Sequence, residues 1–256
     1  SRLVGPEWGR HAETVARAMT LFTEGYGHYP LVTEFQYWGP MHDGVVWPLL
    51  LRPRDVPLAP TWQIAWHTGQ HIGTPFAPSG DRIGEALGQV YTWSEAIEEC
   101  RVMSDLWDQG VALLRSVEAD PGLLPERRLD IGVARALGIQ FRSGLNILRF
   151  YDLRERMVNE PPEKQLVTLK EMRRIVEEEH KSGTELISLC ERDSRLGFHS
   201  EAEGYKYFPE KIRWRMNQLK NVLEKEIPVL EREITSGKDV FAVYAADGLF
   251  LASAGG

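Results

Sequence analysis

The residues best suited to chemistry lie on a short stretch between two tryptophans. Residues 37–48 contain two Gly-containing turn dipeptides, which place His42 and Asp43 on a tight loop between Trp38 and Trp47. A His beside an Asp within an aromatic wall can bind sugar hydroxyls or transfer a proton. The alternative is a turn whose Asp43 caps backbone amides while the tryptophans fill the core. Both interpretations stay open at this loop.

A second group combines Trp62 and Trp66 with His67 and His71. The two histidines are four residues apart and would share one face of a helix, as metal ligands often do. However, residues 68–70 are poor helix formers, no Glu follows His67, and the sequence offers no third ligand. We therefore expect no metal at these histidines and assign Trp62 and Trp66 to ligand contact.

The third group lies on a loop that combines charge, aromatic rings and Gly: Asp193, Arg195, His199, Glu201 and Glu203. Asp193 and Arg195 can form a bidentate pair that fixes the loop. Glu201 and Glu203 offer the carboxylate pair that glycoside hydrolysis requires, although their spacing in sequence does not set their separation in space. The alternative is a helix-capping loop with solvated acids.

Polar groups of this kind are costly to bury unless they are paired. We therefore expect the loop from Trp38 to Trp47 and the loop from Asp193 to Tyr205 to converge on one concave surface. Elsewhere, the run 177–179 of three Glu indicates a solvated helix face, and His180 indicates a hydrogen-bonded core histidine rather than a catalytic one.

The distribution of residue types points to one ligand class and excludes others. Seven of the 8 Trp precede position 120, and residues 1–120 carry 8 Arg against 15 Asp and Glu. Aromatic faces cover the C–H faces of sugars and carboxylates accept hydroxyl hydrogens, so carbohydrate is the leading ligand class. The alternative is that these Trp residues are simply core. The acidic balance argues against nucleic acid, and no apolar run is long enough to cross a membrane. Cys100 and Cys190 show no metal spacing, and no cofactor is indicated.

Apolar periodicity predicts a mostly all-α fold, an antiparallel bundle of long helices. The expected helices cover residues 6–26, 93–117, 125–158, 162–192 and 209–236, the last with a kink at Pro228. Residues 27–92 hold more than half of the 15 Pro, which predicts an ordered, aromatic, loop-rich insertion. Together these form a helical domain over 1–236. Residues 237–256 are expected to contain a short β-hairpin, the start of a following β domain.

Two stretches resemble a known kind of protein. They are YWGPMHDGVVWPL at 37–49 with LAPTW at 58–62, and ERDSRLGFHSEAEGYKYFPEKIRWRM at 191–216. Together they resemble the helical region that lies downstream of the catalytic barrel in large bacterial glycoside-hydrolase-like multidomain proteins. The chain begins at Ser1 and stops in Gly255-Gly256 after a strand-like stretch, so we expect a piece of a longer protein.

The resemblance implies glycan processing by the parent protein and an accessory or site-completing role for this domain. Its expected partners are a carbohydrate ligand and neighbouring domains of the parent chain. The βα units of a hydrolase barrel are absent from the sequence, so we expect no catalysis from this piece alone. Two alternatives remain: a stand-alone helical hydrolase with a carboxylate or metal site, and a structural spacer.

Overall fold

The computed structural model describes residues 5–31, 44–52, 90–157, 160–199 and 204–240. Helices hold 77% of the interpretable residues, which confirms the predicted fold class. The elements in chain order are α1 (Gly5–Trp8), η1 (Gly9–His11), α2 (Ala12–Tyr26), η2 (Gly44–Val46), α6 (Trp93–Glu118), α7 (Pro125–Met157), α8 (Pro162–Cys190), β1 (Phe198–His199), β2 (Gly204–Tyr205), α9 (Pro209–Asn221), the π-helical segment η4 (Val222–Glu226) and α10 (Ile227–Thr235).

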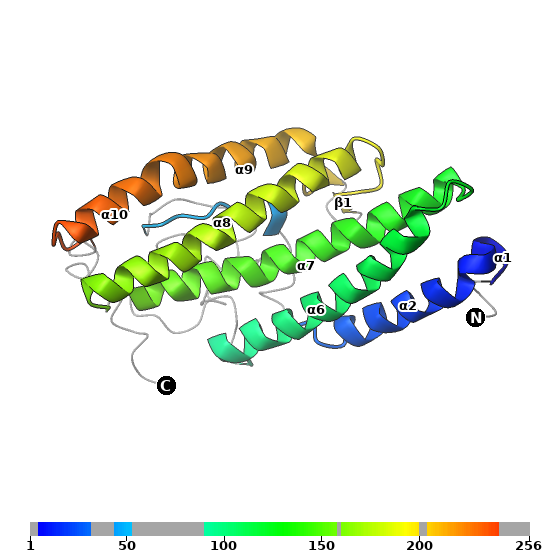
Figure 1. Cartoon of the computed structure of the whole chain (residues 1–256), viewed down its shortest axis with the longest axis horizontal. Helices are drawn as coiled ribbons and strands as arrows, with labels where there is room; N and C mark the ends of the chain where they lie inside the picture. The colour runs from blue at the N-terminus through cyan, green and yellow to red at the C-terminus, as the bar shows by residue number, and fades with distance from the viewer. Residues whose placement is uncertain (1–4, 32–43, 53–89, 158–159, 200–203, 241–256) are drawn as a thin grey trace.

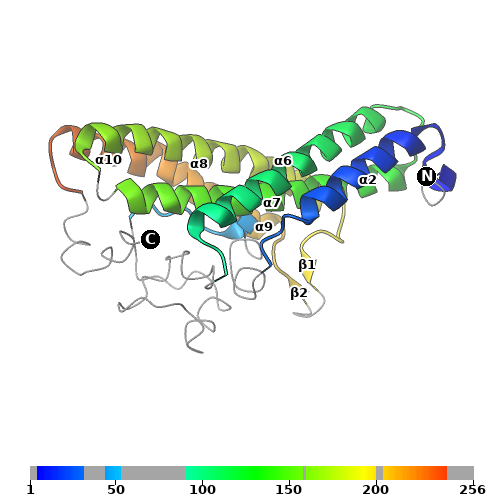
Figure 2. The same ribbon diagram turned by 90° about the horizontal axis from the view of Figure 1, so that it is seen from below.

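The long helices lie side by side in the order in which the chain makes them. Figure 1 shows α2, α6, α7, α8 and the continuous α9–α10 rod in succession, each antiparallel to the one before. Seen from below in Figure 2, the helices form an extended layer, and the hairpin β1–β2 projects from one side of it. The layer gives α7 neighbours on both flanks.

Local sequence signals set the helix starts. Thr92 accepts a hydrogen bond from the backbone of Glu95, whose side chain in turn accepts from the Thr92 backbone, so a capping box opens α6. Pro162 and Pro209 stand at the first position of α8 and α9, where a residue without an N–H loses no bond. These signals involve only neighbouring residues, which is why the sequence alone predicted them.

A tryptophan joins three helices in the first half of the core. The Trp107 indole donates to the carbonyl of Ala134 at 2.8 Å and stacks on Phe22 with ring centroids 4.3 Å apart. A Cβ on Gly138 would lie 2.9 Å from the Trp107 ring, so this Gly makes room for an aromatic side chain. Gly144, by contrast, lies close to another backbone. A Cβ added at Gly44 would lie 3.5 Å from the backbone nitrogen of Gly144.

The helix is π-helical just before Pro228, where a kink was predicted. The backbone N–H of Ile227 bonds to the carbonyl of Val222, five residues earlier, in the π-helical segment η4. Proline has no N–H to continue the ladder and its ring crowds the carbonyl four residues before it. The wider π turn accommodates Pro228 and lets α10 continue the line of α9.

The strands lie in a place the sequence did not predict. The hairpin expected within residues 240–252 falls outside the described residues except for Val240. The described hairpin pairs Phe198 with Tyr205 and His199 with Gly204, inside the segment expected to be a loop. Each strand has only two residues, too few for an alternating pattern to reveal them.

Candidate functional site

The hairpin is anchored by an aspartate at the end of α8. The Asp193 carboxylate accepts from the Arg195 backbone at 3.0 Å, from Arg195 Nε at 3.0 Å and from Arg195 Nη2 at 2.8 Å. The predicted bidentate pair is therefore present. Hydrogen bonds from the Arg195 side chain hold the pKa of Asp193 below its usual value, with the backbone bond adding to the effect.

A glycine and a tyrosine fix the strands behind this pair. Gly197 adopts φ +78°, and an added Cβ there would lie 2.1 Å from the carbonyl oxygen of the buried Tyr207. The hydroxyl of Tyr205 donates to the carbonyl of Ser194 at 2.9 Å. Arg195 also reaches Asp130 on α7 at 3.4 Å. The hairpin is thus attached to the layer at several points.

Two aromatic rings stand on the outside of this braced hairpin. Phe198 and Tyr205 face one another across the strand pair, with centroids 5.5 Å apart and planes at 71°, and remain 53% and 48% exposed. Phe208 and Trp214, just beyond the hairpin, are also exposed. We call Phe198, Tyr205, Phe208 and Trp214 the aromatic surface. Exposed rings on a fixed frame suit the apolar faces of a ligand.

The sequence interpretation did not single out these four rings. It concentrated on the tryptophans of the N-terminal half, whereas the exposed rings come from the stretch 198–214. A usable signal was present. Three aromatic residues flank Lys206 immediately before Pro209, although one of them, Tyr207, is buried.

The structure separates the predicted site residues. Trp47 is 1% exposed and lies in the core, so the core interpretation holds for this residue and its ring offers no face to a ligand. Asp193 and Arg195 are paired, and His199 is half-buried on β1. The remaining predicted residues lie outside the described part of the chain: Trp38, His42, Asp43, Trp62, Trp66 and Glu201. The expected convergence of the two loops therefore stays a prediction.

The pair His67 and His71 also lies outside the described residues. Within the described ranges, no group of three or more His, Cys, Asp or Glu side chains is placed to hold a metal ion. Burial raises the pKa of the half-buried Cys190 thiol to about 11, so this cysteine is protonated at neutral pH.

A buried polar centre joins three helices. Glu179 of α8 is 1% exposed and accepts from Arg215 of α9 at 2.7 Å, from Asn146 of α7 at 2.8 Å and from the Ser143 hydroxyl of α7. The prediction of a solvated face over 177–179 is therefore wrong for Glu179, although Glu177 and Glu178 are exposed.

The same centre holds an extended segment of chain. Arg215 Nε donates to the Trp47 carbonyl at 2.6 Å, and the Gln218 side chain both donates to the Leu49 carbonyl at 2.8 Å and accepts from the Leu49 N–H at 3.2 Å. The Tyr151 hydroxyl donates to the Pro48 carbonyl at 2.9 Å. Side chains of α7 and α9 thus satisfy backbone groups that a neighbouring strand would otherwise satisfy.

The centre is best explained as a positioning element. Its charged groups are nearly inaccessible, and each of its named contacts fixes either a helix or the segment 44–52. Two buried atoms there, Arg215 Nη2 and Asn146 Oδ1, have no hydrogen-bond partner in the structure. We assign no reaction to this centre.

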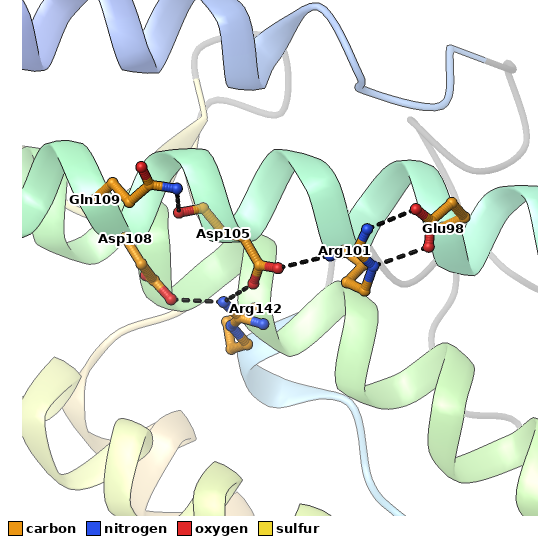
Figure 3. Close-up of polar contacts among 6 residues, drawn as sticks. All are labelled: Glu98, Arg101, Asp105, Asp108, Gln109 and Arg142. Atoms are coloured by element: carbon orange, nitrogen blue, oxygen red, sulfur yellow. Dashed lines mark hydrogen bonds and ion pairs between the residues drawn. The ribbon is translucent and has the colours of Figure 1, made fainter.

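A further ionic network ties α6 to α7 at the surface, as Figure 3 shows. Arg142 lies 2.9 Å from Asp105 and 2.6 Å from Asp108, and Arg101 bridges Asp105 and Glu98. Each basic group has carboxylate partners from its own or the adjacent helix. The network therefore aligns two helices rather than presenting free groups to a ligand.

The described residues form an antiparallel helical domain with a short hairpin that carries exposed aromatic rings. Comparison with protein-family models gave no match, and neither curated proteins nor solved structures matched the chain. Within the described residues, no helix is both long enough and apolar enough to cross a membrane.

Proposed function

We propose that this chain is the helical accessory domain of a carbohydrate-active, glycoside-hydrolase-like protein and that it contacts a glycan through the aromatic surface. The observation that carries the proposal is the braced, half-exposed pair of Phe198 and Tyr205. Rings held at fixed positions cover sugar C–H faces without losing much side-chain entropy on binding. The neighbouring Arg195 guanidinium, which is 55% exposed, donates hydrogen bonds to hydroxyls.

Affinity electrophoresis against a panel of soluble polysaccharides tests this proposal. We expect at least one polysaccharide to retard the protein, and Phe198→Ala or Tyr205→Ala to weaken that binding about tenfold, as expected for loss of one aromatic contact. Tyr26→Ala is the matched control, because Tyr26 is 56% exposed on α2, at the opposite edge of the layer from α9. Equal retardation of all variants, or none by any polysaccharide, contradicts the proposal.

We further propose that this piece alone does not hydrolyse glycosides, because it lacks the βα units of a barrel. A screen with chromogenic aryl glycosides measures this directly. Turnover that is abolished by Glu201→Gln or Asp43→Asn, but not by Glu178→Gln, would instead favour the stand-alone hydrolase.

One observation favours the spacer alternative as a second candidate. The rings of Trp47 and Trp107 are used to pack the long helices, as expected for a rigid element between neighbouring domains. A spacer would tolerate all substitutions of the aromatic surface. The same electrophoresis experiment therefore separates the two candidates.

A further inference from the structure

A second potential site lies away from the aromatic surface, where the first helical turns meet the turn between α6 and α7. A cleft of about 410 Å³ is present there. Its walls include Trp8, Arg10, His11, Asp120, Leu123 and Arg127. The volume falls in the range of small-molecule sites, and the lining combines an indole and leucines with basic groups and with the carboxylates of Glu7 and Asp120.

Asp120 fixes which ring nitrogen of His11 carries a proton. One carboxylate oxygen accepts from the Gly122 N–H at 2.9 Å, and the other contacts His11 Nε2 at 2.7 Å and Arg10 Nη2. These hydrogen bonds, with that of His11 the largest, hold the pKa of Asp120 well below its usual range. An ionised carboxylate only accepts, so His11 Nε2 carries the proton and Nδ1 of neutral His11 is an acceptor.

Arg10 has donors to spare. Its side chain is 75% exposed, and its Nε lies 3.4 Å from His11 Nε2, a nitrogen that already donates to Asp120 and so cannot accept. The Asp120 carboxylate accepts from three groups: Arg10 Nη2, His11 Nε2 and the Gly122 N–H. The remaining guanidinium N–H groups of Arg10 therefore face solvent or a ligand.

Arg127 adds a second, more rigid guanidinium. It stacks over the Trp8 ring at 5.5 Å and lies 3.1 Å from Asp130 and 3.7 Å from Glu7. Its Nε is buried and has no hydrogen-bond partner in the structure. That Nε is inaccessible, so the cleft offers chiefly the spare donors of Arg10, beside the Glu7 and Asp120 carboxylates, the His11 imidazole and an apolar wall. This set is complementary to a ring that carries both a carboxylate and hydroxyls.

We propose that this cleft binds one sugar-acid unit, a hexuronate. Its carboxylate lies against Arg10 and Arg127, a hydroxyl donates to His11 Nδ1, and a C–H face of the ring packs on Trp8. The site extends the proposed function to acidic glycans and rests on that function for its biological setting. Its geometry is independent of the hairpin, so the two proposals can fail separately.

Titration of the full chain with D-glucuronate, followed by calorimetry or by backbone amide shifts, tests the proposal. D-Glucose, which lacks the carboxylate, and acetate, which lacks the ring, are the comparison probes. We expect saturable glucuronate binding, with each comparison probe at least about tenfold weaker, since each loses one group of contacts.

Two arginine variants locate the binding. Arg10→Gln removes an exposed charge with little packing and should weaken glucuronate binding about tenfold. Arg101→Gln is the matched control, an exposed arginine of α6 that also pairs with carboxylates, and should bind as the unaltered protein does. Phe198→Ala should likewise leave glucuronate binding unchanged, which separates this cleft from the aromatic surface.

The proposal is overturned by absence of saturable glucuronate binding, or by equal affinity for glucose or acetate. Equal losses in Arg10→Gln and Arg101→Gln would also overturn it, because they would show general attraction to surface charge. Weakening by Phe198→Ala but not by Arg10→Gln would assign acidic glycans to the aromatic surface and leave the cleft without this function.

Discussion

Two Arg–carboxylate pairs in this molecule have opposite surroundings. Glu179 and Arg215 are each 1% exposed at the junction of α7, α8 and α9, whereas the hairpin pair joins Asp193, which is 6% exposed, to Arg195, which is 55% exposed. The Glu179–Arg215 pair loses its hydration and depends on every remaining contact, while the hairpin pair keeps the hydration of its arginine. The comparison teaches that an Arg–carboxylate pair can hold helices together in the core, as at Glu179, or fix a hairpin at the surface, as at Asp193.

The largest expected effect comes from breaking the buried pair. Glu179→Ala leaves Arg215 as an unpaired buried charge, and we expect a loss of about 3–5 kcal/mol in the free energy of unfolding, measured by urea denaturation. Glu178→Ala, on the exposed side of the same helix, should change it by less than about 0.5 kcal/mol. The double variant Glu179→Leu with Arg215→Met should recover much of the loss. Similar losses in Glu179→Ala and Glu178→Ala would contradict the special role of the buried pair.

A glycine of the hairpin comes next. Gly197→Ala introduces a Cβ at φ +78° and 2.1 Å from the Tyr207 carbonyl oxygen, so we expect a loss of about 2–3 kcal/mol. Gly237 has the same φ with nothing within 4 Å of the added Cβ, and Gly237→Ala should lose only about 1 kcal/mol. Thermal or urea unfolding gives both values. If the two losses are equal, the close approach to Tyr207 does not constrain the hairpin.

The Asp193–Arg195 pair, in which only the arginine is exposed, should contribute a smaller, pH-dependent amount. The folded-state pKa of Asp193 is lowered by hydrogen bonds from Arg195, so its stabilisation is present above the ordinary pKa of aspartate and is lost as pH falls through the folded value. Asp193→Asn should therefore lower stability by less than about 1 kcal/mol at pH 7. The difference from the unaltered protein should shrink below about pH 4. A difference that is constant from pH 7 to pH 3 would argue against this ionic contribution.

The smallest effect on stability is expected at the aromatic surface. Phe198→Ala removes a half-exposed ring and one cross-strand contact with Tyr205, so we expect a change of about 0.5 kcal/mol in unfolding free energy. Circular dichroism should show an unchanged helical signal. A much larger loss would mean that Phe198 is part of the core and would remove the main support for a ligand-contacting role.

The helix boundaries could be predicted because their causes are local. Thr92 and Glu95 cap α6 through a four-residue pattern, and Pro162 and Pro209 start their helices at the only helical positions that cost no hydrogen bond. The Asp193–Arg195 pair was also predicted, since two residues that are two apart in a turn can meet without help from elsewhere. The aromatic surface could not be predicted in this way, because the exposure of a ring depends on which other side chains pack over it.

Glu179 shows most clearly why sequence reasoning misassigned a residue. As the last of three consecutive Glu it suggested a solvated face, yet Met172, Val176, Glu179 and Gly183 continue one buried row at three- and four-residue spacing. The row was visible in the sequence. The sequence did not show that this buried row can hold a carboxylate, because that requires Arg215 and Asn146 from other helices.

The sequence by itself therefore determined the helical class, the order of the helices and most of their ends, through periodicity, caps and proline, which act within a few residues. Only the tertiary structure decided that Trp47 fills the core, that Glu179 is buried and paired, and that Phe198 and Tyr205 stay outside. The physical reason is that burial and pairing are properties of a side chain's neighbours in space. In this chain those neighbours come from segments far apart in the sequence, such as Trp47 and Arg215.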